Sequence, residues 1–557
     1  MPEYLTLKPA NCKNCYRCIR HCPVKSIRFA HNQAHIVADD CILCGHCFVA
    51  CPQNAKEIRD DRAAAAELLQ NGGPVIASVA PSFRAYYGGL TISSLGEALK
   101  GLGFTGAEET ARGATVVKRQ YDALVDQESS AVILSSCCHT VNVMVQKYYP
   151  EALAYLAPVV SPMLAHGMDI KRRLPKAKTV FIGPCISKKA EAEIYRPSID
   201  CVLTFDELSS WLKEKNIPFP SIQDSGPPGR TRIFPTPGGI VRTMEKKNPR
   251  YTYLSIDGIE NCMGAVEDVL KGNLDNCFIE LSACTGSCVG GPVMGNPPAL
   301  IRDYISVSAY AGEKDFEVFE YPGEALHKTM ENLKVRHTRM GARAIEEVLR
   351  QLGKTKPEDE LNCGSCGYNT CREKAAAVLE GKATLTMCLP YLKEKAESFS
   401  DTIIKNTPNA IIVLNESFEV QQINGAACRL MNISSPQNIL GDQVVRILDP
   451  LPFIDAGQKA QNQYNKGVFL ADYQKYVDQT IIYDKDYHII ICIMRDITAE
   501  TLQREAKEVF NRNAVTITDK VIEKQMRAVQ EIASLLGETT AETKIALTKL
   551  KESLTNE

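Results

Sequence analysis

The sequence predicts an α+β protein of several domains, and three observations support this prediction. The chain has 557 residues, whereas a domain usually holds about 100–200. Runs rich in β-branched residues alternate with helical stretches over residues 74–325, which favours an α/β domain with parallel sheets. The 22 cysteines fall into separate groups along the chain. The expected regions are 1–58, 59–325, a linker helix at 326–356, 357–397, 398–500 and 501–557.

Composition narrows the range of functions. The net charge of −2 argues against a nucleic acid or an anionic membrane as the main partner. No apolar run approaches the ~20 residues of a membrane span, and the first residues lack a secretory leader. We therefore expect a cytoplasmic protein. In that reducing compartment the cysteines are expected to be metal ligands rather than disulfides, which favours an anaerobic setting.

Residues 1–58 carry two cysteine runs, each ending in Cys-Pro. Both have the spacing Cys-x2-Cys-x2-Cys-x3-Cys, in which three thiolates bind one cluster and the fourth binds the other, as in a two-cluster 4Fe-4S ferredoxin domain. A pair of zinc knuckles is the alternative, but it does not explain the repeated Cys-Pro. The predicted ligands are Cys12, Cys15, Cys18 and Cys51 for one 4Fe-4S cluster, and Cys41, Cys44, Cys47 and Cys22 for the other.

Residues 59–325 begin with a short connecting helix at 59–72 and continue with strands at 75–79, 131–134 and 179–182. Cysteines directly follow the second and third of these strands. Loops at the carboxyl ends of parallel strands are where α/β folds bind ligands, so the cysteines of this region are expected to converge on one metal site. They are Cys137 with Cys138, Cys185, and the pair Cys284 and Cys288.

These three groups resemble the cluster-binding motifs of the iron–iron hydrogenases, and the resemblance covers most of residues 1–325. It implies an α/β catalytic domain with an H-cluster. In that cofactor four thiolates hold a 4Fe-4S cluster, and one of them bridges to a di-iron subsite with CO, cyanide and azadithiolate ligands. The thiolates carried over by motif are Cys138, Cys185, Cys284 and Cys288, with Cys288 as the bridge.

The same resemblance assigns roles to further residues. Lys188 would donate a charge-assisted hydrogen bond to one cyanide, and the stretch Ala80-Pro81-Ser82 would line the other. Glu191 matches the acid that closes the second motif. Cys137 matches the cysteine that passes protons to the azadithiolate, a task that suits a thiol because its pKa lies near neutrality. A small buried residue beside a true ligand is the alternative for Cys137.

The chain also departs from the family pattern. Catalytic members follow the paired cysteines with Pro-x-Trp, where this chain has His139-Thr-Val-Asn142, and Gly183 and Ser282 stand in place of methionines. We therefore expect a more polar pocket with smaller side chains. The positions of the two relay glutamates fall near Gly113, Ala114 and Val117, without an acid. Glu109, Glu280 or ordered water could replace them, and we expect slow turnover.

Residues 326–356 are rich in Lys, Arg and Glu and are expected to form an exposed charged helix and linker. The following cysteines resemble the small 4Fe-4S domain of corrinoid iron–sulfur proteins and of some electron-transport subunits, with zinc as the alternative metal. The resemblance implies a fourth 4Fe-4S cluster, at an electron exit on the far side of the catalytic domain. Its ligands would be Cys363, Cys366, Cys371 and Cys388.

Residues 398–500 resemble a PAS domain through the stretch Asn409–Phe418 and the exit Arg495-Asp-Ile-Thr. A strand hairpin is expected around the Asp-Lys-Asp turn at 484–486. His488 is expected to be an ordinary strand residue, and no cofactor is assigned to this region. In the tail 501–557, apolar residues recur every seven positions, which predicts a packing or dimer seam on a helix that breaks at Gly537.

The chain as a whole resembles an iron–iron hydrogenase of the sensory type, which interconverts H2 with protons and electrons. The implied partners are maturation proteins that deliver the di-iron subsite, a regulatory kinase or phosphatase, ferredoxin, and a second copy in a homodimer. A metabolic ferredoxin-linked hydrogenase and an iron–sulfur electron-transfer protein without the di-iron subsite are the alternatives. The cysteines without ligand spacing are expected to be small buried residues: Cys201, Cys262, Cys277, Cys428 and Cys492.

Overall fold

A computed structural model describes residues 4–128, 130–224, 229–245, 247–295, 300–335, 340–459, 462–536 and 540–555. The chain divides into two compact units, Met1–Leu392 and Lys393–Glu557. No helix in these described ranges is long and apolar enough to cross a membrane.

The N-terminal region consists of short paired strands around its cysteine loops. β1 (Leu5–Leu7) pairs antiparallel with β4 (Lys56–Ile58), and β2 (Ile27–Ala30) pairs with β3 (Gln33–Ile36). Each cysteine run places its third cysteine on a four-residue helix, which follows a residue in the left-handed conformation. These helices are α1 (Arg17–Arg20) and α2 (His46–Val49).

The first parallel sheet has the strand order β6-β5-β8-β9. All five residues of its central strand β5 are buried, as expected of a parallel sheet covered on both faces. The predicted strands at 75–79 and 179–182 and the predicted helix at 59–72 are confirmed as β5, β8 and α3. The strands are β5 (Val75–Val79), β6 (Gly106–Glu109), β8 (Lys178–Gly183) and β9 (Cys201–Thr204). The helices are α3 (Arg62–Gln70), α4 (Phe83–Tyr86), α5 (Ile92–Leu102), α6 (Ala111–Asp126), α8 (Pro162–Arg173), α9 (Ser187–Ile194) and α10 (Phe205–Glu214).

A second parallel sheet has the order β10-β11-β7. Its register pairs Cys277 of β11 with Val132 of β7 and with Thr252 of β10, so the predicted strand at 131–134 is also confirmed. Cys277 is buried here, as are the other four cysteines without ligand spacing. The strands are β7 (Val132–Leu134), β10 (Thr252–Asp257) and β11 (Cys277–Ser282), and the helices are α7 (His139–Tyr148), α11 (Gly239–Thr243), α12 (Ile259–Leu270) and α13 (Leu300–Tyr310).

The segment after the second sheet differs from the expected exposed linker helix. Residues 326–335 run along the α/β region: the Val160 N–H bonds to the Leu326 carbonyl, and the Leu333 N–H bonds to the Gln146 carbonyl. The first helix within 326–356 is α14 (Ala342–Gln351), which has one strongly apolar face that packs on α15. The sequence did not predict this packing, because the few apolar residues of α14, such as Val348 and Leu349, stand among charged ones. The following helices are α15 (Cys371–Leu379) and α16 (Leu389–Asn406).

The second unit contains a five-stranded antiparallel sheet in the order β13-β12-β16-β15-β14. The predicted hairpin is confirmed: β15 pairs with β16 from Val477 with Asp496 to Asp484 with Ile489. The expectation that His488 is a strand residue is wrong, because it lies in the turn between these strands with φ +55°. Two long helices follow, while the predicted break at Gly537 lies outside the described residues. The elements are β12 (Ala410–Asn415), β13 (Val420–Ile423), β14 (Gln463–Leu470), β15 (Lys475–Asp484), β16 (Ile489–Asp496), α17 (Gly425–Leu430), α18 (Leu451–Lys459), α19 (Thr498–Leu536) and α20 (Thr540–Thr555).

Candidate metal centre

Four cysteines of the α/β region stand just beyond the carboxyl ends of parallel strands. Cys138 follows β7 and is the N-cap residue of α7. Cys185 lies between β8 and α9, while Cys284 and Cys288 follow β11. Both sheets therefore contribute to one place, at the strand ends where α/β folds bind ligands.

The electrostatics of the thiols indicates that they lie close together. Burial raises the pKa of Cys185 to about 11, and the neighbouring Cys138 adds to the rise. Burial also raises the pKa of Cys284 and Cys288, and Cys138 and Cys185 again add to both shifts. Cys138, Cys185 and Cys284 are partly exposed and Cys288 is exposed. As neighbouring thiolates the four would repel one another, and a cationic iron centre would stabilise them, so this donor set fits a 4Fe-4S cluster. Within the described ranges, no three His, Cys, Asp or Glu side chains are arranged to hold a single metal ion.

Glycines shape the loop that carries two of these thiols. Gly286 has φ +80°, a conformation that other residues adopt at a cost, and its N–H bonds to Asp257 Oδ2. A Cβ on Gly290 would collide with the carbonyl oxygen of Thr285. The turn between Cys284 and Cys288 therefore favours glycine at 286, and the loop just after Cys288 has no room for a side chain at 290.

Lys188 and Glu191 form a buried ion pair one turn after Cys185. Lys188 Nζ donates to Glu191 Oε2 at 2.5 Å and to the carbonyl oxygen of Cys137 at 3.1 Å, and Ser161 Oγ donates to Glu191 Oε2 at 2.9 Å. Burial opposes both charges, but the pairing outweighs it: the pKa of Lys188 lies above its ordinary value and that of Glu191 well below. The site therefore holds a fixed ammonium beside the cysteines.

Lys328 is a third charged residue beside the Lys188–Glu191 ion pair, and the sequence did not predict its place there. Its Nζ lies 2.7 Å from Glu191 Oε1, and the side chains of both residues are fully buried. The ammonium also lies 4.5 Å from the centre of the Tyr195 ring, a favourable cation–π distance. No spacing or periodicity marks a lysine of this kind among the charged residues around it.

His139, a departure from the family pattern, is the first residue of α7 and is 3% exposed. Burial lowers its pKa to about 3, so the ring is neutral at physiological pH. Its Nδ1 lies 4.0 Å from Glu191 Oε1, and neither ring nitrogen has a hydrogen-bond partner in the described structure. The ring lines a mainly apolar cavity of about 90 Å³ together with Cys41 and Lys147.

Cys137 has a close hydroxyl neighbour. Its sulfur lies 3.1 Å from the hydroxyl oxygen of Tyr121, which accepts the N–H of Ser136 at 2.9 Å. Burial raises the pKa of Cys137 to about 12, against the opposing effects of Tyr121 and Lys188. The thiol is therefore held protonated, so the expectation of a pKa near neutrality is wrong, and the Tyr121 hydroxyl is its close hydrogen-bonding partner.

The stretch Ala80-Pro81-Ser82 directly follows the carboxyl end of β5 in the first parallel sheet. Ser82 is fully buried and its hydroxyl has no hydrogen-bond partner among the described residues, which is unusual unless a bound group supplies one. Gly183 lies next to this stretch. A Cβ there would stand 2.7 Å from the Phe181 ring and 3.2 Å from Ala80 Cβ, so Phe181 fills the room that a larger residue at 183 would need.

Of the two acids considered as proton acceptors, Glu280 is the better placed. Glu109 is held in a buried ion pair with Arg232, whose Nε lies 2.8 Å from Glu109 Oε2. Glu280 Oε2 accepts the N–H groups of Ile240 and Val241, both at 3.0 Å. Burial raises its pKa to about 7, and its charge acts on Cys137. Glu280 can therefore change protonation near neutral pH within electrostatic range of the thiol.

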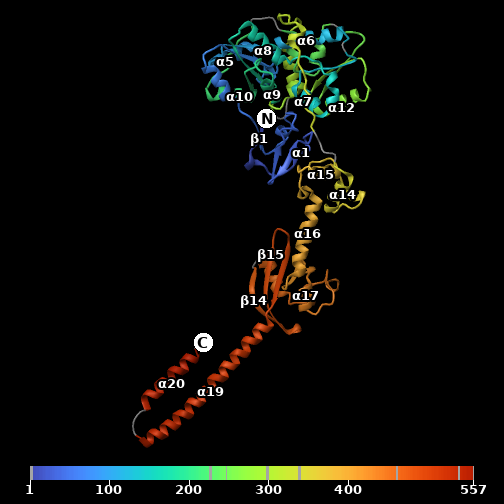
Figure 1. Cartoon of the computed structure of the whole chain (residues 1–557). Helices are drawn as coiled ribbons and strands as arrows, with labels where there is room; N and C mark the ends of the chain where they lie inside the picture. Colours follow the sequence, from blue (N-terminus) through green and yellow to red (C-terminus); the bar gives the residue numbers. More distant parts are fainter. Residues whose placement is uncertain are drawn as a thin grey trace. The chain divides into compact units, whose positions relative to one another are not determined.

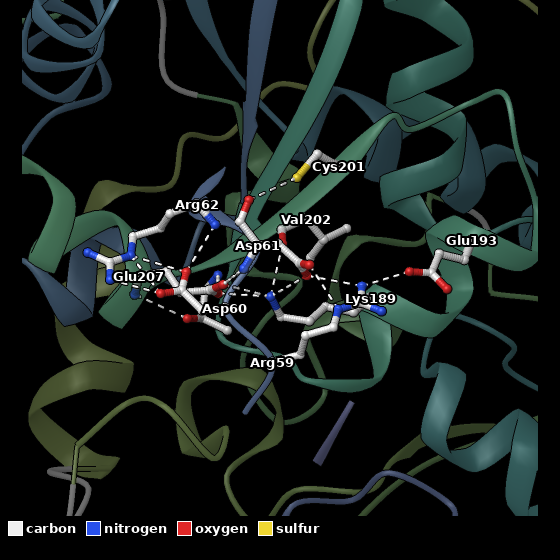
Figure 2. Close-up of polar contacts among 10 residues, drawn as sticks. Arg59, Asp60, Asp61, Arg62, Lys189, Glu193, Cys201, Val202 and Glu207 are labelled. Atoms are coloured by element: carbon white, nitrogen blue, oxygen red, sulfur yellow. Dashed lines mark hydrogen bonds and ion pairs between the residues drawn. The ribbon is translucent and has the colours of Figure 1, made fainter. Parts of the chain in front are cut away.

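Lys189 fixes α9, the helix that carries Lys188 and Glu191. Its Nζ is fully buried and donates to Asp61 Oδ2 at 2.8 Å and to both carboxylate oxygens of Glu207 at 2.8 and 2.9 Å. Figure 2 shows these acids around the lysine, with Arg59 and Glu193 beside them. The neighbouring residues Lys188 and Lys189 therefore have different roles. Lys188 contacts Glu191 beside the cysteines, whereas Lys189 connects α9 to the segment before α3.

The two remaining cysteine groups lie next to each other. Lys25 Nζ donates to the carbonyl oxygen of Gly367 at 3.1 Å, and the Phe29 N–H bonds to the Lys382 carbonyl at 2.8 Å. Lys382 also forms an ion pair with Asp40 at 2.7 Å. We expected the fourth cluster to form an electron exit on the far side of the catalytic domain, and this placement is wrong. The segment that carries its expected ligands contacts the N-terminal region instead: Cys363, Cys366, Cys371 and Cys388. In Figure 1 the N-terminal strands lie between α15 and the α/β elements.

Comparisons with known families match three parts of the chain. Residues 73–292 match the family described as iron only hydrogenase large subunit, C-terminal domain. Residues 4–65 match the 4Fe-4S dicluster domain, and residues 359–390 match an Fe-S cluster family. The chain is therefore related to the iron-only hydrogenases over its α/β region and to iron–sulfur families on either side.

Similar proteins include two curated hydrogenases. Iron hydrogenase 1 of Clostridium pasteurianum is 27% identical over 284 residues, which are 39% of this chain and 49% of that protein. The chain thus spans about half the length of this relative. The periplasmic [Fe] hydrogenase large subunit of Nitratidesulfovibrio vulgaris is 26% identical over 56% of this chain and 91% of its own length. A solved variant of [FeFe]-hydrogenase HydA1 from Chlamydomonas reinhardtii is 16% identical over 50% of this chain and 100% of that chain, with a TM-score of 0.39.

Proposed function

We propose that this chain, related over residues 73–292 to the iron-only hydrogenases, is an iron–iron hydrogenase that interconverts H2 with two protons and two electrons. The observation that carries the proposal is the set of four neighbouring thiols, from both parallel sheets, beside the Lys188–Glu191 ion pair. Cys138, Cys185, Cys284 and Cys288 would hold the 4Fe-4S part of the H-cluster. When bound, its di-iron subsite supplies the place where H2 is split or formed.

The residues around the cofactor have separate tasks in this proposal. Lys188 offers a charged donor to one cyanide, and Ser82 offers a hydroxyl that no other described residue uses. Cys137 holds and moves a proton at its sulfur, with Tyr121 as its neighbour. Glu280 is the nearby acid whose pKa of about 7 suits proton exchange at neutral pH.

The cysteines outside the α/β region would hold the other clusters. Eight N-terminal cysteines would bind two 4Fe-4S clusters, with the assignment predicted from their spacing, and the group from Cys363 to Cys388 would bind a fourth. The contacts of Lys25 with Gly367 and of Lys382 with Asp40 bring the N-terminal region close to this fourth group, which supports electron exchange between their clusters. Zinc stays an alternative at the last group until its metal is measured.

A role in H2 sensing is the finer part of the proposal. The second unit has an antiparallel sheet with two long helices after it. This arrangement suits a PAS domain that signals to a kinase or phosphatase. In this proposal the protein is cytoplasmic and forms a homodimer. A sensor needs no fast turnover, and we expect it to be slow. The alternative, a metabolic hydrogenase that reduces ferredoxin, predicts fast turnover with soluble ferredoxin.

Infrared spectroscopy and H2 oxidation assays of protein matured with the di-iron subsite test the proposal. We expect CO and CN stretches, and loss of most activity with retained bands in Cys137→Ala. Absence of these bands and of any response to H2 would instead support the iron–sulfur electron-transfer alternative. Full activity in Cys137→Ala would remove this cysteine from the proton path.

A further inference from the structure

We propose that Lys328 is a positioning residue of the cofactor site, which balances the charge of Glu191 and so leaves the Lys188 ammonium available to an anionic group. This inference rests on the proposed function. It concerns a residue that neither a cysteine motif nor the family match includes, since the match ends at residue 292.

The two oxygens of Glu191 are divided between two lysines. Oε2 accepts from Lys188 at 2.5 Å, and Oε1 accepts from Lys328 at 2.7 Å. Glu191 and Lys328 are both fully buried, so solvent does not screen this interaction. The nearest ring nitrogen of His139 stands 4.0 Å from Glu191 Oε1, beyond hydrogen-bond distance, so the two lysines are the cations that contact this carboxylate.

The charge of this cluster differs with and without Lys328. Lys188 and Glu191 alone would sum to zero, and the carboxylate would engage the ammonium fully. With Lys328 the three side chains carry a net charge of +1. Cyanide ligands and thiolates are anionic, and burying such a group is favourable only beside a compensating positive charge.

The segment around Lys328 is built to hold it in place. The Lys328 N–H bonds to the Pro158 carbonyl at 3.0 Å, and the Leu326 carbonyl accepts the Val160 N–H at 3.0 Å. The Tyr195 ring covers the ammonium on a further side, and the Tyr195 hydroxyl donates to the Thr329 carbonyl at 3.3 Å. A buried lysine tethered on both sides is a poor candidate for a solvent-facing linker residue.

The test uses the full chain and the synthetic di-iron complex with azadithiolate, CO and cyanide as the probe. Uptake of the complex and the CN stretching frequencies are measured for the parent, Lys328→Met, Lys328→Arg and the control Lys334→Met. Lys334 lies on the same segment but is 60% exposed and pairs with exposed Glu151. Thermal unfolding before addition of the complex shows whether each variant is folded.

We expect Lys328→Met to take up about 10-fold to 100-fold less of the complex, with shifted CN bands in the part that is loaded. Lys328→Arg should recover most of the uptake, and Lys334→Met should behave like the parent. The double variant Lys328→Met/Glu191→Gln restores the net charge of +1 and should recover uptake relative to Lys328→Met alone. A purely structural role for Lys328 predicts no such recovery.

Two outcomes separate this inference from the function on which it rests. Parent protein without CO and CN bands would overturn the proposed function. Parent protein with those bands, together with parent-like uptake and bands in Lys328→Met, would overturn the role of Lys328 alone. Failure of the double variant to recover uptake would also overturn the charge argument.

Discussion

The hydroxyl oxygen of Tyr121 lies 3.1 Å from the sulfur of Cys137. This oxygen also accepts the N–H of Ser136 at 2.9 Å, and Ser136 Oγ donates its own proton to the Val159 carbonyl at 2.8 Å. The Tyr121 proton can therefore point toward the thiol. The fully buried ring packs against Phe278 of the second sheet, so the hydroxyl is held in place without solvent.

The first prediction is that Tyr121→Phe slows H2 turnover by about 10-fold, because Cys137 loses its nearest proton partner. The ring stays in its packing position, so the infrared bands of the loaded cofactor should be retained. Hydrogen–deuterium exchange catalysed from D2 in H2O measures the proton step. Tyr149→Phe is the control, since the Tyr149 hydroxyl bonds to partly exposed Glu267; equal rates in both variants would exclude Tyr121 from the path.

The sequence predicted three of the described parallel strands, β5, β7 and β8, and proposed the four central thiols as ligands, because these signals are local. Strand residues such as those of β5 form short, mostly apolar runs, and each of the four cysteines stands directly behind such a run or in a Gly-rich loop. Tyr121 and Lys328 carry no such signal. Tyr121 occupies one apolar position of the amphipathic helix α6, and Lys328 is buried only because distant Glu191 receives it.

The docking of the C-terminal cysteine group could not be derived from spacing either. Its contacts with the N-terminal region join residues more than 300 positions apart, both through polar pairs such as Lys382 with Asp40 and through a shared apolar cluster that includes Ile19 and Tyr368. The structure does explain why no acid occupies position 113, one of the positions expected for the relay glutamates. A Cβ on Gly113 would collide with the backbone around Pro162 and His166, so the close packing of α6 on α8 excludes any side chain there.

The second prediction concerns the pH dependence of stability. Burial raises the pKa of Glu280 from an ordinary 4.5 to about 7, so folding favours the protonated acid. That stabilisation is present below pH 4.5 and is lost as the pH rises to 7, at a cost of about 3 kcal/mol. Glu280→Gln keeps the acceptor for the Ile240 and Val241 N–H groups but cannot ionise.

Urea unfolding of metal-free protein at pH 5 and pH 8 measures this effect. The free energy of unfolding of the parent should fall more over this range than that of Glu280→Gln, by about 3 kcal/mol at most. Identical pH dependence in the two proteins would mean that Glu280 does not titrate in this range. Glu97→Gln serves as the control, because Glu97 is 45% exposed and pairs at the surface with Lys100.

The third prediction is that Lys189→Met destabilises the α/β region by about 3–5 kcal/mol, because it leaves the largely buried carboxylate of Glu207 without its cation. It also removes one of the two cations on Asp61, which keeps only Arg59. Lys100→Met, on an exposed pair, should cost about 0–1 kcal/mol. Urea unfolding followed by circular dichroism gives both values. A loss of less than 1 kcal/mol in Lys189→Met would show that the network is not needed to hold α9.

The fourth prediction concerns Gly367, which has φ +91° and faces the N-terminal region. A Cβ there would stand 2.9 Å from Ile19 Cβ and 3.1 Å from the Tyr16 carbonyl oxygen. Gly367→Ala should therefore push the loop away and break the contact with Lys25. We expect faster amide hydrogen exchange in residues 16–29 as well as in 363–371.

Gly272→Ala is the matched control for the last prediction. Gly272 has φ +72°, so it carries a similar backbone strain of about 1 kcal/mol as alanine, but a Cβ there meets nothing within 4 Å. Residues 16–29 should exchange as in the parent in this control. If Gly367→Ala also left them unchanged, the two cysteine regions would not be coupled through this loop, and electron exchange between them would need another contact.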